Sequence, residues 1–203
     1  MAESLIVIRS GATDYEMQGR IRGGVDIPLC QAGVAEAQRA AELLVAHPPQ
    51  AIYTAAVACA METGRIIGAT LSLRPRLIRG LHNLGQGLWE GMLVDDIRRR
   101  QPKLYRQWQD NPWAVAPPEG ELLEDACERV EATLEKLLRR HGEGRLALVV
   151  PDPLDRIVRW MLAGESMGDL WARDADRGAV AELPVSSQWA RGPRADRRIP
   201  TPI

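Results

Sequence analysis

Short apolar runs alternate with segments of helical spacing along the first part of this chain. The apolar runs are residues 5–8, 51–54 and 73–81, and the segments between them, 29–47 and 56–71, carry apolar residues at helical spacing. A short, continuous apolar run such as the first is typical of a strand that is buried on both faces. A strand–helix–strand–helix–strand order predicts a parallel sheet covered by helices. We therefore expect an α/β fold, a three-layer α/β/α sandwich around a mostly parallel central sheet.

The second half of the chain continues this alternation after a less regular insert. The insert, at about 89–120, holds one helical piece, several aromatic residues and a Pro-Pro loop, and such an insert usually packs over the end of a sheet and shapes a pocket. The remaining predicted elements are a helix over 121–142, a strand over 145–150, a helix over 153–164 and an edge strand over 179–183. We expect a single domain over 1–190 and a loose tail, rich in arginine and proline, over 191–203.

Charge and cysteine content restrict the classes of function. The formal net charge is -1, so no global field favours nucleic acid or an anionic membrane as a partner. The 3 cysteines have no motif spacing, which argues for a reducing compartment and against a disulfide framework. No signal-peptide pattern opens the chain, and no apolar stretch approaches the ~20 residues of a membrane helix. We therefore expect a cytoplasmic protein.

The first strand leads directly into Arg9-Ser10-Gly11 and a glycine-rich segment. A strand that ends in this way is typical of a chain that delivers a charged residue and a hydroxyl to a site. A serine nucleophile needs a base whose pKa lies near the working pH and a group that stabilises the developing charge. By itself this stretch leaves two readings open: Ser10 is a nucleophile, or it stands where another nucleophile has been replaced.

Arg9-Ser10-Gly11-Ala12-Thr13 is the first of several short motifs that follow one another in order. The others are Gly19 to Gly23, Asp26-Ile27-Pro28-Leu29, Leu29 to Gly33, the strand and helix "AIYTAAVACAMETGRII", Gly87-Leu88-Trp89-Glu90-Gly91, Pro117 to Glu121, and the strand–turn–helix over 145–164. In this order they resemble the histidine phosphatase superfamily, in its phosphoglycerate-mutase-like branch, whose first motif reads Arg-His-Gly-x-Thr. The resemblance covers roughly residues 4–185 and implies a phosphoglycerate mutase-like fold.

The resemblance also implies what each site residue should do. In this family the first histidine attacks phosphorus and carries the phosphoryl group. Two arginines and a second histidine neutralise the phosphoryl oxygens, and a carboxylic acid protonates the leaving oxygen. Transferred position by position, these roles fall on Ser10 for the first histidine, Cys59 for the arginine of the second helix, Asn83 for the acid, Asp152 for the second histidine and Glu16 for an asparagine that faces the phosphate. Arg9 is retained, and Arg20 matches at the rim. The seven positions together would form a vestigial phosphate pocket.

These replacements all change the charge of the pocket in one direction. Cys59 removes a fixed positive charge, while Asp152 and Glu16 add negative ones, so a dianionic phosphate would meet one arginine and two carboxylates. Loss of one preorganised donor typically costs ~100- to 1000-fold in rate, and several such losses leave little catalysis. We therefore predict no catalytic residues and a pseudophosphatase, an inactive homologue that acts as a binding or scaffold protein. Its partner would be a small ligand other than a dianionic phosphate, or a protein.

Two enzymatic alternatives stay open. A rebuilt hydrolase or phosphatase site would use Ser10 and Asp152 with Arg9, although an aspartate beside an arginine has a lowered pKa and is a poor base. The other alternative is residual phosphatase activity through Arg9, Arg20 and water. The oligomeric state is also open, and a homodimer is one possibility.

Several residues receive a structural interpretation. Cys59, Asp152, Glu16 and His82 have no paired metal-ligand spacing, so we expect no metal and no cofactor. We interpret Glu90 as a residue that bonds backbone or pairs with an arginine. Trp89, Trp108 and Trp113 are interpreted as core packing under the insert rather than as the mouth of a pocket.

Overall fold

Five strands form one sheet in the computed structural model, which describes residues 2–141, 143–168, 170, 179–186 and 189. The strands are β1 (Ser4–Arg9), β2 (Ala51–Ala55), β3 (Arg76–Ile78), β4 (Arg145–Val150) and β5 (Val180–Pro184), and their order across the sheet is β3-β2-β4-β1-β5. β1 pairs in parallel with β4, and β2 pairs in parallel with both β4 and β3, whereas β5 runs antiparallel to β1. The predicted, mostly parallel α/β fold is therefore confirmed.

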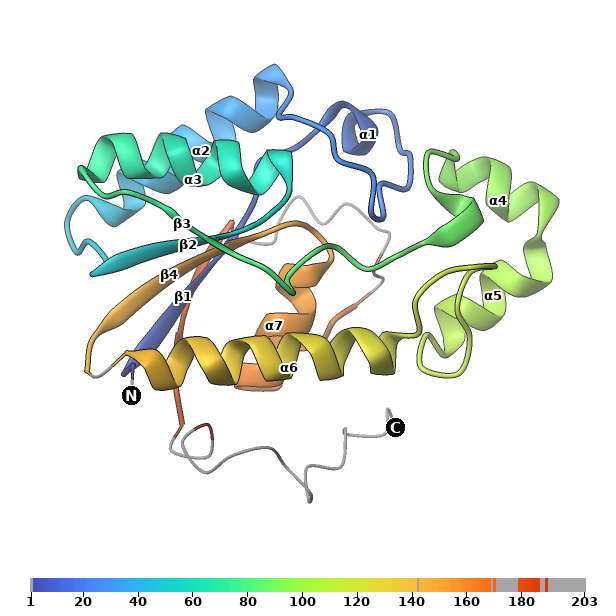
Figure 1. Ribbon diagram of the computed structural model, residues 1–203. Helices are drawn as coiled ribbons and strands as arrows, with labels where there is room; N and C mark the ends of the chain where they lie inside the picture. The colour runs from blue at the N-terminus through green and yellow to red at the C-terminus, as the bar shows by residue number, and fades with distance from the viewer. Residues whose placement is uncertain (1, 142, 169, 171–178, 187–188, 190–203) are drawn as a thin grey trace.

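Helices cover both faces of this sheet. Figure 1 shows α2 (Gln31–Leu44) and α3 (Ala58–Leu71) above the sheet, and α6 (Leu123–Arg140) and α7 (Leu154–Ala163) below it. Because β1 and β4 lie between the two helical layers, their side chains are buried on both faces. The apolar residues 5–8 of β1 are at most 1% exposed. The continuous apolar run in the sequence is the direct result of that position.

The insert forms two longer helices, not the single helical piece that was expected. After the short 3-10 helix η1 (Gly87–Trp89) come α4 (Val94–Arg100) and α5 (Pro102–Asp110). Gln101, between them, has φ -131° and ψ 52°, because the residue before a proline avoids helical geometry and Pro102 suits the first turn of a new helix. In Figure 1 both helices lie beyond the end of the sheet at which β1 finishes.

The tryptophans of the insert pack as interpreted. Trp89 is 0% exposed and Trp108 is 3% exposed. Trp113 packs against Trp160 of α7, with 5.2 Å between the ring centroids and 53° between the ring planes. These rings fix the insert against the rest of the molecule and do not open onto the cavity described below.

Two elements differ from the sequence prediction. β3 covers only the centre of the predicted strand over 73–81. The short helix α1 (Asp14–Met17) was not predicted, although Thr13 and Glu16 have the spacing of a helix-capping box.

The tail over 191–203 lies outside the described residues, so its predicted looseness stays a prediction. No helix of the described residues has the length and apolar character that crossing a membrane requires.

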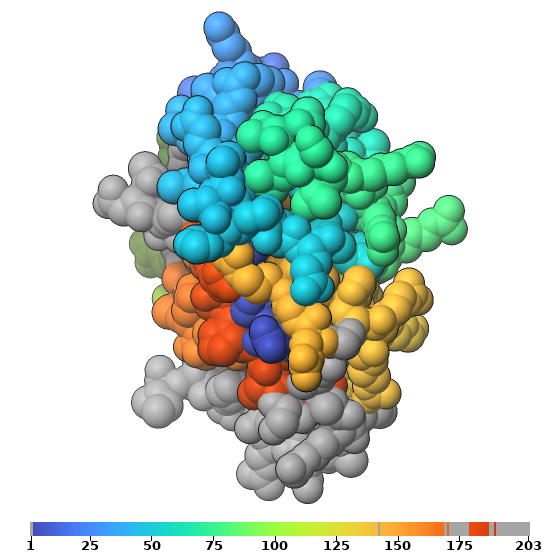
Figure 2. All heavy atoms as spheres, turned by 90° about the vertical axis from the view of Figure 1, so that its left-hand side faces the viewer, coloured from blue at the N-terminus to red at the C-terminus, as the bar shows by residue number. Residues whose placement is uncertain are grey.

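A cluster of polar side chains joins β5 to the end of the molecule at which the parallel strands begin. Figure 2 views that end and shows the first described residues, in dark blue, enclosed between the chain near residue 145 and β5. The Arg145 guanidinium donates to both Glu182 oxygens at 2.8 and 2.6 Å, and the Ser4 hydroxyl donates to one of them at 2.7 Å. These hydrogen bonds lower the pKa of Glu182 to about 2.

Glu182→Gln is expected to change how stability depends on pH. Since the carboxyl pKa is lower in the folded state than its usual 4.5, the ion pair stabilises the fold above about pH 4.5, and this contribution disappears as the pH falls towards 2. The pair is partly exposed, so the difference at pH 7 should stay below about 1 kcal/mol. Urea denaturation of both proteins at pH 7 and pH 3 measures it. A difference that grows on acidification would contradict the assignment.

Candidate functional site

The site forms where β1 and β4 end side by side. Arg9 is the partner of Val150 in the sheet, and the backbone N–H of Ser10 donates to the Val150 carbonyl at 2.8 Å. The residues that follow the two strands, Ser10 and Asp152, are therefore brought to the same edge of the sheet. The carboxyl edge of a parallel sheet is the usual place for a binding site in an open α/β fold.

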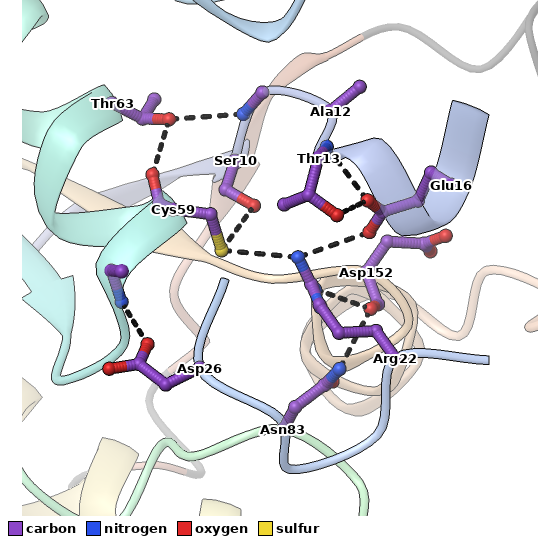
Figure 3. Close-up of polar contacts among 12 residues, drawn as sticks. Ser10, Ala12, Thr13, Glu16, Arg22, Asp26, Cys59, Thr63, Asn83 and Asp152 are labelled. Atoms are coloured by element: carbon purple, nitrogen blue, oxygen red, sulfur yellow. Dashed lines mark hydrogen bonds and ion pairs between the residues drawn. The ribbon is translucent and has the colours of Figure 1, made fainter. Parts of the chain in front are cut away.

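The loop that contains Ser10 is tied to α3. The Gly11 N–H donates to the Thr63 hydroxyl at 3.0 Å, and this hydroxyl donates to the Cys59 carbonyl at 2.8 Å. The Ser10 hydroxyl lies 3.4 Å from the Cys59 sulfur, to which it donates. Figure 3 shows these contacts and the Asp26 carboxylate, which accepts the Ala58 N–H at the first turn of α3.

Arg22 occupies the centre of the cluster, and the sequence-based charge count did not include it. Its Nη1 lies 3.1 Å from the Cys59 sulfur and 3.1 Å from Glu16 Oε1, and its Nη2 donates to the Asp152 carbonyl at 2.9 Å. Arg22 is 5% exposed. The expected pocket contained one arginine and two carboxylates. The structure adds the buried guanidinium of Arg22, so the expected count of positive charges is wrong. Arg22 stands at the variable position of the Gly-Arg-Ile-x-Gly motif, so the motif gave no reason to assign it to the site.

The two carboxylates of the predicted pocket are already paired. One Glu16 oxygen faces Arg22, and the other accepts hydrogen bonds from the backbone N–H and the hydroxyl of Thr13. Asp152 Oδ1 accepts from Arg156 Nε at 2.8 Å, and the Arg156 side chain is only 2% exposed. The proposed pairing of Ser10 with Asp152 is not formed, because the Ser10 hydroxyl donates to Cys59 and the Asp152 carboxylate is held by an arginine one helical turn away.

Cys59 lies beneath Arg22 and is 2% exposed. Burial raises the pKa of its thiol, and the positive charge of Arg22 opposes this only in part. The thiol therefore stays neutral near pH 7. A neutral thiol carries no fixed charge and is a weak hydrogen-bonding group.

Arg22→Ala is expected to make the Cys59 thiol accessible to a thiol reagent. The guanidinium lies against the sulfur, and its removal opens a path from the neighbouring cavity. The rate of modification by dithionitrobenzoate, measured in a Cys30→Ser background because Cys30 is partly exposed, should rise clearly above that of the parent. Arg20→Ala is the matched control, since it removes a cation from the same cavity without uncovering the sulfur. Equal rates in the two variants would contradict the arrangement.

The other predicted site residues lie at different depths. Arg20 donates from Nη1 to the Gly91 carbonyl at 2.7 Å and from Nε to Gln18 Oε1 at 2.8 Å. Asn83 donates from Nδ2 to the Asp152 carbonyl at 3.1 Å and is 2% exposed. Arg9 is half-buried at the end of β1, and its backbone N–H donates to the Ala179 carbonyl at 2.8 Å.

A cavity of about 310 Å³ opens beside this cluster. It is lined by Glu16, Gln18, Gly19, Arg20, Ile21, Arg22, Gly23, Asn83, Gln86, Leu93, Val94, Asp95, Asp152, Pro153 and Leu170. Arg9, Ser10 and Cys59 are not on this lining. Arg22, which contacts Cys59 and lines the cavity, therefore separates Ser10 and Cys59 from the space that a ligand can enter.

Arg129 of α6 holds the segment that contains Asn83, a role that the sequence did not indicate. Its guanidinium donates to the carbonyls of Gly80, His82 and Asn83 at 3.1, 2.9 and 3.1 Å and pairs with Glu121 at 2.5 Å. Partial burial and the Arg129 charge lower the pKa of His82. No three His, Cys, Asp or Glu side chains of the described residues are grouped closely enough to hold a metal ion.

Glu90 bonds backbone N–H groups, which confirms its structural interpretation. Its Oε1 accepts from the Gly24 N–H at 2.7 Å and from the Gln86 N–H at 3.0 Å. A Cβ at Gly23 would lie 2.3 Å from the same oxygen. The glycine-rich segment after α1 therefore needs its small residues in order to pack on Glu90.

Known proteins share this fold along nearly the whole chain. A structure described as Bacillus stearothermophilus YhfR has a TM-score of 0.79 and 26% identity, and the match covers 92% of each chain. A mycobacterial glucosyl-3-phosphoglycerate phosphatase in complex with VO3 has a TM-score of 0.75 and 24% identity, over 83% of this chain and 86% of the other.

Curated proteins match at similar identity. Phosphoserine phosphatase 1 of Hydrogenobacter thermophilus is 25% identical over 179 residues, which is 88% of this chain and 85% of that protein. Glucosyl-3-phosphoglycerate phosphatase of Mycobacterium tuberculosis is 29% identical over 192 residues, 94% of this chain and 81% of that protein. The family profile described as histidine phosphatase superfamily (branch 1) matches residues 5–190. With its strand order, its motifs and this match along the chain, the protein belongs to branch 1 of the histidine phosphatase superfamily.

Proposed function

We propose that this member of the family is a pseudophosphatase, a binding or scaffold protein that does not transfer phosphoryl groups. The observation that carries the proposal is the position of Arg22. Its buried guanidinium lies against Cys59, pairs with Glu16 and donates to the Asp152 carbonyl. The chain's own cation thus covers the place at which the family nucleophile would meet phosphorus.

The groups that remain do not support a nucleophilic step. The Ser10 hydroxyl donates to a neutral thiol and has no base beside it. Neither carboxylate of the site is free to accept its proton, because Glu16 is engaged by Thr13 and Arg22, and Asp152 by Arg156. A serine without an adjacent base is a weak nucleophile near neutral pH.

The charge distribution also disfavours a dianionic phosphate. Arg22, the buried cation at the centre of this cluster, is already neutralised by Glu16, whose carboxylate oxygen lies 3.1 Å from the guanidinium. Phosphoryl transfer depends above all on preorganised positive charge around the equatorial oxygens. A pocket whose guanidinium is already paired with a carboxylate of the same chain offers much less positive charge to a phosphate. This supports binding of another kind of partner, a small molecule or a protein.

An enzyme with a rebuilt site is the alternative function, because two relatives are named as phosphatases of phosphoserine and of glucosyl-3-phosphoglycerate. The test is therefore turnover by the purified protein on p-nitrophenyl phosphate, O-phosphoserine and 3-phosphoglycerate. We expect rates equal to those of buffer alone.

A second protein, with Ser10→His, Cys59→Arg, Asp152→His and Arg22→Gln together, shows whether restoring the family residues and clearing the pocket restores turnover. Arg9→Ala in the wild-type background separates genuine activity from a contaminant, since a contaminant is unaffected by it. Wild-type turnover that is lost in Arg9→Ala would overturn the proposal and support an enzyme with a rebuilt site.

A further inference from the structure

The inner wall of the cavity contains amide groups that no described residue satisfies. Gln86 lines the cavity and is 2% exposed, yet neither Nε2 nor Oε1 of its side chain has a hydrogen-bond partner among the described residues. Asn83 is also on the lining; its Nδ2 donates to the Asp152 carbonyl, and its Oδ1 has no hydrogen-bond partner among the described residues. An unpaired buried polar group destabilises the protein, so a ligand that pairs with these atoms gains binding free energy.

The charged residues of the cavity leave one positive charge uncompensated. Of the three carboxylates on the lining, Glu16 pairs with Arg22 at 3.1 Å, Asp152 with Arg156 at 2.8 Å and Asp95 with Arg98 at 3.4 Å. Arg20, by contrast, donates only to the neutral oxygens of Gly91 and Gln18. The described residues of the lining therefore present one cation without an anionic partner.

The rest of the lining restricts the size and the charge of a ligand. Ile21, Leu93, Val94, Pro153 and Leu170 form its apolar part, and the volume of about 310 Å³ lies at the lower end of the range for small-molecule sites, ~300–1,000 Å³. A second negative charge on the ligand would lie near three carboxylates of the lining, and Arg20 can compensate only one negative charge of the ligand. The ligand is therefore small and singly negative.

We infer that this cavity binds a small molecule with one carboxylate, paired with Arg20, and a primary carboxamide, or a group with the same donor and acceptor edge, paired with Gln86 and Asn83. A carboxamide matches the unpaired atoms because its NH₂ group donates to Gln86 Oε1 and Asn83 Oδ1 while its carbonyl accepts from Gln86 Nε2. The Gln86 amide is buried, and the residue lines the cavity, so the amide meets the ligand after a side-chain rotation, a common change on binding. This inference rests on the proposed binding function and names its ligand class.

The probes are succinamate and glutaramate, each of which has one carboxylate and one primary carboxamide. Succinate and glutarate are the matched dicarboxylates, and succinamide and glutaramide are the matched diamides. In calorimetric titrations of the full chain we expect saturable binding of at least one monoamide. The corresponding dicarboxylate and diamide should bind at least about tenfold more weakly, because each loses one charge-assisted or paired contact.

Variants then assign the two ends of the ligand. Gln86→Leu should abolish the preference for the monoamide over the dicarboxylate, and Gln86→Met, which keeps the approximate size of the side chain without its amide, should do the same if the leucine variant does not fold. Arg20→Met should abolish the preference for the monoamide over the diamide, whereas Arg39→Met, an exposed arginine of α2, should leave it unchanged. Failure of both monoamides to bind, or unchanged preferences in the Gln86 and Arg20 variants, would overturn the inference.

The two proposals fail in different ways. Turnover of a phosphate monoester that depends on Arg9 overturns the pseudophosphatase function, whatever the titrations show. Absence of turnover together with absence of monoamide binding overturns only the assignment of this ligand class, since a protein partner would still fit a scaffold role.

Discussion

Gly33→Ala should lower the free energy of unfolding by about 3 kcal/mol, because the first turn of α2 touches the backbone of the loop after β1. A Cβ at Gly33 would lie 2.0 Å from the Ala12 oxygen and 2.7 Å from the Ala12 nitrogen. The contact is reciprocal, since a Cβ at Gly11 would lie 2.2 Å from the Gly33 oxygen. Backbone atoms on both sides leave no flexible side chain that could move aside, so the loop itself must shift.

Urea denaturation followed by circular dichroism measures this effect. Gln38→Ala, at an exposed position of the same helix, is the control and should change the free energy of unfolding by less than about 0.5 kcal/mol. If Gly33→Ala were as mild as this control, the close approach of the helix to the loop would not exist in solution. The vestigial site would then lack the support that places Ser10 against Cys59.

Arg129→Met should destabilise the protein by about 3 kcal/mol, because it breaks a largely buried ion pair and leaves several backbone carbonyls without their donor. The guanidinium of Arg129 satisfies three carbonyls of residues 80–83 and pairs with Glu121, and both side chains are 18% exposed. Methionine keeps the aliphatic part of the side chain, so the change isolates the polar contacts. Urea denaturation followed by circular dichroism measures this loss in the free energy of unfolding.

Arg139→Met on the same helix is the matched control. Its side chain is 45% exposed and lies 3.8 Å from Glu135, so its loss should cost less than about 1 kcal/mol. The pKa of His82 provides a second readout, because removal of the Arg129 charge should raise it towards its ordinary value. A titration by nuclear magnetic resonance in which the pKa of His82 stays as low as in the wild type would argue against this role.

The order of strands and helices was predictable because burial leaves a periodic trace in the sequence. Residues 5–8 and 145–150 read as continuous apolar runs since β1 and β4 lie at the centre of a sheet covered on both faces. The insert was less predictable. The break between α4 and α5 depends on one proline, and the rings of Trp89 and Trp108 carry no periodic pattern that shows what they pack against.

The candidate site was predictable only in part. Ser10 and Asp152 follow two strands, so their approach at the sheet edge followed from the topology. The direction in which each side chain points did not follow from the topology. The Asp152 carboxylate pairs with Arg156 in the first turn of α7, and the Asp152 carbonyl faces the cluster.

The sequence by itself determined the order of strands and helices and the order of the family motifs, because strand periodicity and motif order are properties of neighbouring residues. Only the tertiary structure decided which side chains meet where these motifs converge. Arg22 and Asp152 are 130 positions apart in the chain, yet 2.9 Å separates the guanidinium from the carbonyl. Charge and hydrogen bonding act over a few ångströms, so their balance in the site depends on distances between remote segments, which the order of residues does not contain.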